Sequence, residues 1–259
     1  MRRWTLYLCA SALLMGAAAC SDDDDGASAD GTSSTTASST SSTTTTEPRA
    51  DGRRDVMTVE GFSALEPGGY VIDPDGDPAT PLTVTYDVHD KGWSQWLGAV
   101  KFYDTGHAGV SITTVTNVVR DGCEDHRPAD PAVGPSVEDL ATALTGLAPF
   151  EVTAPPSDVT KLGYRGKHLQ LTVPDLPYTG EGADRLFSDC QEDSLHSWIA
   201  ENNGGSFYGY NGEPGRTEDF WILDVDGTRL AIVTTSSPET TAADLAEMQA
   251  IVDSIQIET

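Results

Sequence analysis

The chain has 259 residues, and its 15 Lys and Arg against 41 Asp and Glu give a formal net charge of −26 at pH 7. The excess is concentrated after residue 54, where 34 of the acidic residues accompany 10 of the basic ones. A surface this acidic repels phosphate backbones and anionic headgroups, so we expect no nucleic-acid partner.

The first 19 residues have the layout of a secretory signal peptide. Arg2 and Arg3 precede an apolar stretch from Trp4 to Leu14, and three alanines stand directly before Cys20. The stretch is shorter than the roughly 20 residues of a membrane-spanning helix, and small residues suit the cleft of a processing protease. We therefore expect cleavage directly before Cys20.

The alanines before Cys20 also resemble the lipobox of bacterial lipoproteins, in which the cysteine is diacylated with fatty acids such as palmitate. Two acyl chains hold a protein at a membrane, whereas one chain binds only marginally. The resemblance predicts a protein anchored through Cys20 to the extracytoplasmic face of the cell membrane. The alternative is an ordinary secretory signal followed by an incidental cysteine.

Residues 20–54 form the predicted tether between the lipidated cysteine and the folded domain. They contain an acidic run from Asp22 to Asp25 and then mainly Ser, Thr, Ala and Gly, with no large apolar residue. Since no core can form without apolar residues, we expect a disordered segment that lifts the domain off the membrane. Residues 55–259 are predicted to form a single folded acidic domain, because their length is within the range of one domain.

Hydrophobic periodicity predicts two blocks of strands in this domain, each followed by one helix. The first block has strands at 69–72, 82–88, 99–103 and 109–119, and a helix at 137–147 that Ser136 caps. The second block has strands at 158–162, 167–173, 206–210, 219–225 and 228–235, and a helix at 242–254. This order predicts an α+β fold in which two main helices flank a largely antiparallel sheet.

Several segments resemble known families. Val84–Val88 leading to Gly92-Trp93, together with the terminal Ile251–Ile255, is similar to PsbP-like α/β/α proteins and to LpqN-type mycobacterial lipoproteins. Ala154–Pro174 and Trp221–Ile232 are more closely similar to segments of uncharacterised actinobacterial exported domains. The resemblance implies a PsbP-like sandwich and an exported location. Because its motifs are structural, it assigns no catalytic residue.

Cys123 and Cys190 are the two cysteines of the folded domain. An even pair in an oxidising compartment predicts a disulfide. The alternative is a zinc site, because His126 lies three residues after Cys123 and His196 lies six after Cys190. Neither half has the compact ligand spacing of a structural zinc motif, so we predict the disulfide and no metal.

Signatures of the common enzyme classes are absent from the sequence. Gly204–Tyr208 comes nearest to a serine-hydrolase elbow, but Tyr208 stands where the second glycine belongs. Asp73–Asp77 collects carboxylates suited to calcium, yet Pro78 occupies the position of the EF-hand glycine, so we predict a solvated turn. We expect neither a catalytic residue nor a cofactor.

Residues 206–212 mix aromatic side chains with Asn and Gly, as binding loops often do. Tyr208 and Tyr210 are therefore candidate ligand-binding residues, with Trp93 and Trp96 as an additional aromatic platform. The alternative is that these rings belong to the core. Two hypotheses follow: a noncatalytic module that binds an unknown protein or glycan at the cell envelope, or an envelope hydrolase with an unrecognised pair of carboxylates.

Overall fold

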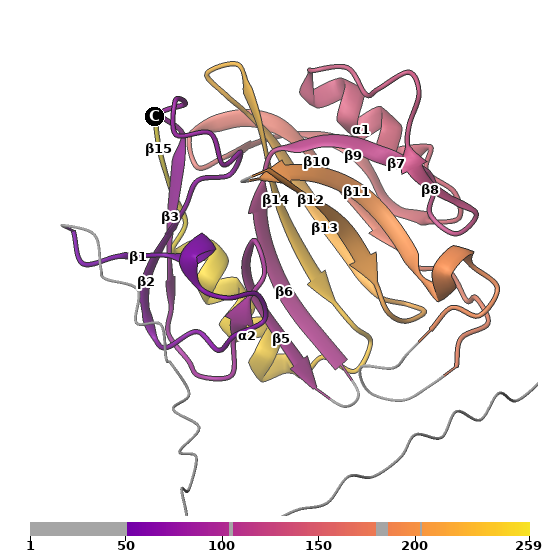
Figure 1. Ribbon diagram of the computed structural model, residues 1–259, viewed down its shortest axis with the longest axis horizontal. Coiled ribbons are helices and arrows are strands. Elements are labelled where there is room, and N and C mark those ends of the chain that lie inside the picture. The colour runs from indigo at the N-terminus through magenta and orange to yellow at the C-terminus, as the bar shows by residue number, and fades with distance from the viewer. Residues whose placement is uncertain (1–50, 104–105, 180–185, 203) are drawn as a thin grey trace, which may run out of the picture. The chain divides into compact units, whose positions relative to one another are not determined.

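The computed structural model describes residues 51–103, 106–179, 186–202 and 204–259. The predicted signal peptide, Cys20 and the tether up to residue 50 lie outside the described residues. Within the described part the fold is mostly β, with two α-helices and three sheets that include a half-barrel (Figure 1).

A seven-stranded sheet, here called the central sheet, runs through the middle of the folded unit (Figure 1). In spatial order its strands are β4 (Ser94–Gln95), β5 (Gly98–Tyr103), β6 (Gly106–Thr113), β14 (Thr228–Ser236), β13 (Thr217–Val225), β10 (Tyr164–Thr172) and β9 (Glu151–Lys161). Each neighbouring pair is antiparallel. Short turns connect several of these pairs, so much of the sheet is built from hairpins.

Two four-stranded sheets accompany the central sheet. The pocket sheet has the order β12 (Gly205–Asn211), β11 (Leu195–Asn202), β7 (Val115–Asp121) and β8 (Asp125–Pro128). The terminal sheet has the order β1 (Arg54–Asp55), β2 (Gly68–Ile72), β3 (Thr83–Val88) and β15 (Gln256–Glu258). The helices are α1 (Val137–Thr145) and α2 (Ala242–Asp253), and short 3₁₀ turns lie at Val56–Thr58 and Gln191–Asp193.

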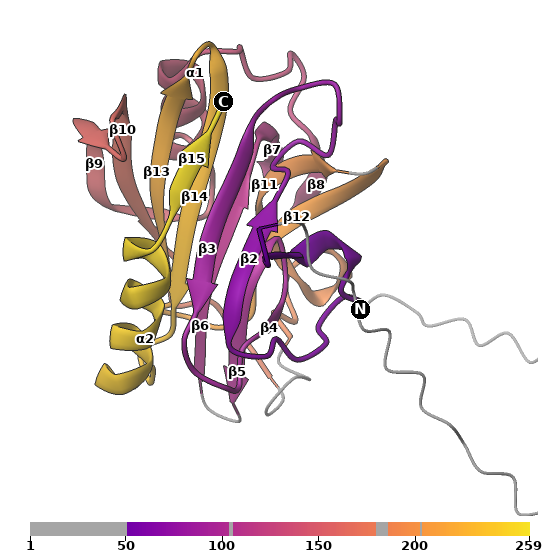
Figure 2. The same cartoon turned by 90° about the vertical axis from the view of Figure 1, so that its left-hand side faces the viewer.

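The central sheet has a hydrophobic core on each face. Figure 2 shows β2 and β3 of the terminal sheet and α2 on the side turned to the viewer. One core is shared with the pocket sheet and α1, and the other with the terminal sheet and α2. Strand β14 shows the consequence, because Ala231 and Val233 enter the first core while Leu230 and Ile232 enter the second. A strand buried on both faces has a continuous apolar run instead of an alternating one.

The predicted α+β sandwich of PsbP-like type is wrong, because the structure is mostly β with three sheets. Both helices occur where expected, and Ser136 caps α1 by accepting a hydrogen bond from the Asp139 backbone N–H at 3.1 Å. The error lies in the strands: β1, β4, β8, β11 and β15 were not predicted, and the single strand predicted at 109–119 is divided between β6 of the central sheet and β7 of the pocket sheet. Strand β11 escaped detection because His196 and Ser197 interrupt its apolar residues, and an interrupted run matches neither strand pattern.

Strand β9 also begins earlier than expected, at Glu151 instead of Asp158. Pro155 and Pro156 lie inside it, and proline normally argues against a strand because it has no N–H to donate. Here β9 is the edge strand of the central sheet, and its pairing with β10 shifts register between His168 and Gln170. An edge position tolerates the prolines, and they limit pairing with another chain.

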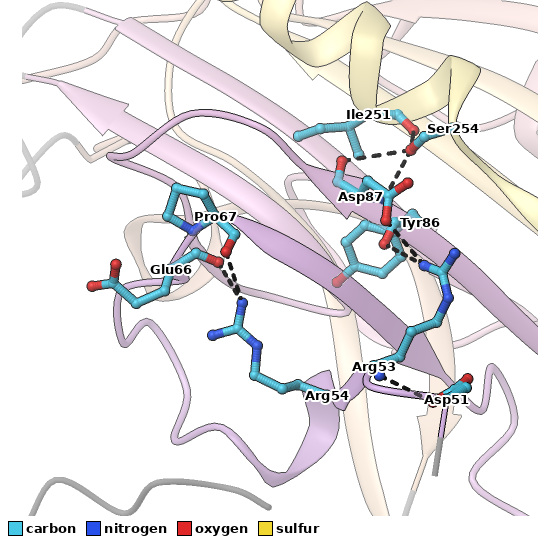
Figure 3. A network of polar contacts seen from close by, with 9 residues as sticks. All are labelled: Asp51, Arg53, Arg54, Glu66, Pro67, Tyr86, Asp87, Ile251 and Ser254. Carbon is cyan, nitrogen blue, oxygen red and sulfur yellow. Dashed lines mark hydrogen bonds and ion pairs between the residues drawn. The ribbon is translucent and has the colours of Figure 1, made fainter. Parts of the chain in front are cut away.

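Arg53 and Arg54 attach the start of the described chain to the terminal sheet (Figure 3). Arg53 Nη1 donates to Asp87 Oδ1 at 3.1 Å, and Arg54 Nη2 donates to the Glu66 carbonyl at 2.7 Å. Ser254, which follows α2, accepts a hydrogen bond from the Asp87 backbone N–H at 2.9 Å. Asp87 therefore connects Arg53, which the sequence assigned to the end of the tether, to Ser254 at the end of α2.

Cys123 and Cys190 lie at disulfide distance, with 2.10 Å between their sulfur atoms, which confirms the predicted pairing. The bond joins the turn between β7 and β8 to the segment that leads into β11. Beside it, the Gln191 backbone N–H donates to the Cys123 carbonyl at 2.7 Å. Because both thiols are used in the bond, they cannot act as zinc ligands.

Replacing both cysteines, Cys123→Ser with Cys190→Ser, should lower the free energy of unfolding by about 4 kcal/mol, because the bond closes a long loop in the unfolded chain. The sequence separation is 67 residues. Urea denaturation of the oxidised protein and the double variant measures the difference. Equal midpoints in the two proteins would contradict a stabilising bond, and reduced wild-type protein serves as the control.

Candidate ligand-binding pocket

A cavity of about 360 Å³ lies between the central sheet and the pocket sheet. Its described aromatic lining comprises Phe62, Trp96, Phe102, His107, His196, Trp198, Phe207, Tyr208 and Tyr210. Its other polar lining residues are Ser111, Ser206, Arg216, Glu218 and Thr235. The volume falls in the usual range of small-molecule sites, which are mostly apolar with a few polar groups that orient the ligand.

Exposed aromatic side chains gather around this cavity. The described ranges contain six exposed large hydrophobic side chains, and three of them line it: Phe62 at 54%, Phe102 at 57% and Tyr210 at 41%. The Phe62 ring stacks on Trp96 with centroids 4.9 Å apart, and Trp96 meets Phe207 edge-on at 5.7 Å. Apolar surface concentrated at one place on an otherwise acidic domain marks an interaction site.

The backbone around Phe62 and Trp96 is in an unusual conformation. Phe62 has φ of 60°, and Leu97, directly after Trp96, has φ of 43°. Both values are left-handed, which costs free energy for bulky residues. The Phe62 N–H donates a hydrogen bond of 3.0 Å to the Gln95 carbonyl, which holds Phe62 beside β4. The turn buries Leu97 in the core and leaves Trp96 on the cavity wall.

Strands β11 and β12 supply the opposite wall. His196 on β11 meets Tyr208 and Tyr210 edge-on, at centroid distances of 5.5 and 5.8 Å. Gly209 lies between the two tyrosines, and a Cβ atom there would collide with Ser197 Oγ and Trp198 Nε1. The glycine therefore allows β12 to pack closely on β11 while its tyrosines line the cavity.

Arg216 and His107 form a buried polar pair on the central-sheet side of the cavity, and each is 6% exposed. Arg216 Nη2 lies 2.7 Å from His107 Nε2, and Thr235 Oγ1 lies 2.6 Å from the same nitrogen. Since a guanidinium can only donate, His107 Nε2 accepts and the ring proton is assigned to Nδ1. Burial lowers the pKa of His107 well below its usual value, and Arg216 lowers it further, so the ring is neutral.

Two N–H groups of this pair lack partners. Arg216 Nε and His107 Nδ1 are buried and have no hydrogen-bond acceptor among the described residues. Burial lowers the pKa of Arg216 to about 10, so the guanidinium stays charged at neutral pH. A buried donor without an acceptor costs about 1–3 kcal/mol, so the pair is retained at a cost to stability.

Glu218 lies in β13 and Arg216 directly precedes that strand, and both residues line the cavity. Glu218 is 2% exposed, and its Oε1 accepts a hydrogen bond from Ser197 Oγ at 2.9 Å. Burial raises the pKa of Glu218, although the Ser197 hydrogen bond and the Arg216 charge act in the opposite direction. Among the described residues that line the cavity, Glu218 is the one carboxylate.

The candidates named from sequence are placed in two locations. Tyr208, Tyr210 and Trp96 lie together on the cavity walls. Trp93 does not, because it is 1% exposed in the core shared with the terminal sheet, where its Nε1 donates to Glu247 at 3.2 Å. For Trp93 the structure therefore agrees with the alternative, in which the ring belongs to the core.

Sequence reasoning missed the residues that give the cavity its polarity: His107, Arg216 and Glu218. One signal was present in the sequence. Phe220 and Ile222 occupy alternate positions that face the core, and Arg216 and Glu218 continue the same alternation toward the N-terminus. Charged residues at successive inward positions of a strand indicate either a buried ion pair or a site.

A larger hollow of about 700 Å³ lies at the start of α1 beside β9 and β10, and three cations line it: Arg165, Lys167 and Arg229. Lys167 pairs with Glu138 at 2.8 Å and with Asp158 at 3.0 Å. Arg229 donates to backbone carbonyls, including that of Val115 at 2.7 Å. These contacts explain Lys167 and Arg229 as parts of the fold, and Arg165 is exposed on the surface. The aromatic cavity, whose charged residues are buried, is the stronger candidate site.

No group of three His, Cys, Asp or Glu side chains in the described ranges could hold a metal ion. Of the helices in those ranges, none has the length and apolar character needed to cross a bilayer. No protein-family profile matches the sequence, and it matches neither a curated protein nor a solved structure. The geometry of the cavity is therefore the basis for a functional proposal.

His196 should make stability depend on pH. Burial, and to a lesser extent His126, lowers its pKa from 6.5 to about 4. The neutral ring is thus favoured in the folded state, so the stabilisation is present above pH 6.5 and is lost as pH falls toward 4. We expect a loss on the order of 2 kcal/mol for this partly buried group.

Thermal unfolding of the wild type and of His196→Gln between pH 7.5 and pH 4, at about half-unit steps, measures this effect. The glutamine variant should lose less stability over the interval than the wild type, because it has no ring to protonate. Parallel curves for the two proteins would show that His196 does not contribute to the pH dependence.

Proposed function

We propose that this protein is a membrane-anchored lipoprotein of the cell envelope whose folded domain binds a small ring-containing ligand without chemical conversion. The observation that carries the binding role is the aromatic cavity, whose lining combines exposed Phe62 and Phe102 with buried Arg216 and Glu218. The location rests on the sequence, through the apolar leader and the alanines before Cys20.

The cavity offers little for hydrolysis. A glycosidase mechanism uses two carboxylates across the scissile bond, and the described lining contains Glu218 alone. Ser194 Oγ lies 3.0 Å from His196 Nε2, but His196 Nδ1 has no carboxylate to orient it among the described residues. A histidine with a pKa of about 4 is also a weak general base near neutral pH. These features favour binding over catalysis.

Anchoring is tested by mass spectrometry of the N-terminal peptide of the protein purified from membranes. We expect Cys20 to carry a diacylglyceryl group and to be the first residue of the mature chain. Cys20→Ser should abolish the modification. An unmodified Cys20 on wild-type protein that remains in the cytoplasm would contradict the proposed location.

Ligand binding is tested by thermal unfolding of the full-length protein in phosphatidylcholine vesicles. The probes are p-cresol, indole-3-acetate, adenosine and methyl β-D-glucopyranoside. A ligand at about 100 times its Kd stabilises by about 2.7 kcal/mol, so we expect one probe class to raise the unfolding midpoint by roughly 5 °C or more.

The shift should disappear in Phe62→Ala and persist in Leu245→Ala. Leu245 is the matched control, because it is also an exposed large apolar residue, at 39%, but lies on α2 away from the cavity lining. If no probe stabilises the wild type, or if the stabilisation survives Phe62→Ala, the cavity is not a binding site for small ring compounds.

A further inference from the structure

Aromatic rings line the walls of the cavity, and Phe62, Phe102 and Tyr210 are the exposed ones among them. Trp96, stacked between Phe62 and the edge of Phe207, lies on one wall, while Tyr208 and Tyr210 lie on the other. Such rings carry partial negative charge on their faces and present large apolar areas. They suit a ligand that is itself ring-shaped and has an apolar face with C–H groups.

The polar side of the cavity presents both donors and an acceptor. Arg216, Ser111 and Thr235 line it with side chains that can donate hydrogen bonds. Glu218 contributes a carboxylate within the same lining. A hydroxyl group both donates and accepts, so a ligand with several hydroxyl groups can satisfy both kinds of partner at once.

Charged ligands fit this arrangement less well. An anion would approach Arg216 but also the carboxylates of Glu218 and of Glu213, which is 5% exposed behind it and bound by the Ser237 hydroxyl. A cation would approach the buried guanidinium of Arg216. Like charges are costly where water is excluded, so a neutral ligand loses the least on entry.

We propose that the ligand is a neutral carbohydrate, which places a pyranose ring against the exposed Phe62 ring that Trp96 supports and directs its hydroxyl groups to the polar side of the cavity, where Arg216 and Glu218 lie. This rests on the binding function proposed above and names the chemical class of its ligand. A volume of about 360 Å³ corresponds to roughly twelve waters, which is room for a monosaccharide or the end of a glycan.

The test is isothermal titration of the full-length protein in phosphatidylcholine vesicles with sugars, which do not partition into the bilayer. Probes are the methyl pyranosides of glucose, galactose and mannose, each compared with its uronic acid and its 2-amino counterpart, and p-cresol as an apolar ring. We expect one neutral pyranoside to bind with Kd at or below about 1 mM, at least tenfold more tightly than its charged counterparts.

Trp96→Ala and Glu218→Gln should each weaken that binding about tenfold or more, which corresponds to roughly 1.4 kcal/mol. Leu245→Ala and Glu151→Gln are the matched controls, because both residues are exposed outside the cavity lining, and they should leave Kd within about twofold. Far-UV circular dichroism checks folding. If the buried Glu218→Gln variant does not fold, the exposed Phe62→Ala variant takes its place.

The outcomes separate the ligand class from the binding function itself. Tightest binding of a uronic acid, an amino sugar or p-cresol, sensitive to Trp96→Ala, would overturn the neutral carbohydrate and leave the pocket as a binding site. Neutral-sugar binding that is unaffected by Trp96→Ala would overturn the assignment to this cavity. The absence of binding by all probes would overturn both proposals.

Discussion

The burial of the central sheet on both faces is the constraint on which the rest of the structure depends. Strand β14 contributes Ala231 and Val233 to one core and Leu230 and Ile232 to the other, so neither face can be left to solvent. The terminal sheet with α2 covers one face, and the pocket sheet with α1 covers the other. Full burial of each large apolar side chain contributes roughly 1.5–3 kcal/mol, which is why two covering layers are required.

The cavity lies where the second of these coverings is incomplete. Phe220 and Ile222 of β13 pack in the interface between the two sheets, but at the start of this strand Glu218, and Arg216 directly before it, line the cavity instead. These side chains are charged and buried, and removing them from water costs more than replacement by apolar residues of similar size. An apolar pair at these positions would extend the core and close the gap. The observed residues therefore favour an interaction with something other than the protein itself.

Much of the local structure could be predicted from the sequence, because it depends on neighbours along the chain. The capped helix at Val137–Thr145 and the hairpin strands joined at Asp226-Gly227 follow from local pattern and turn chemistry. The disulfide followed from the cysteine count and the expected compartment. The fold class could not be predicted, because β11 lacks a clean period and β9 contains prolines that only its edge position permits.

The site was predictable only in part, for a related reason. The sequence identified residues 206–212 because aromatic, Gly and Asn residues adjoin there, and it named Trp96 together with Trp93 as an additional aromatic platform. Trp93, three residues away, has the same chemistry but the opposite environment, since β4 begins just after it and directs the two rings to different layers. His107 and Arg216 meet across 109 residues, a distance that no local pattern reports.

The strained backbone at Phe62 indicates that this residue serves ligand binding and not stability. A left-handed conformation at a bulky residue costs on the order of 1–3 kcal/mol, and the exposed ring that it places on Trp96 gains little from burial. Glycine at this position would relieve the backbone, and a polar residue would avoid the exposed apolar surface. Stability alone therefore does not account for phenylalanine here. A ligand that covers the ring would account for it, because the apolar area that the fold leaves exposed is then buried on binding.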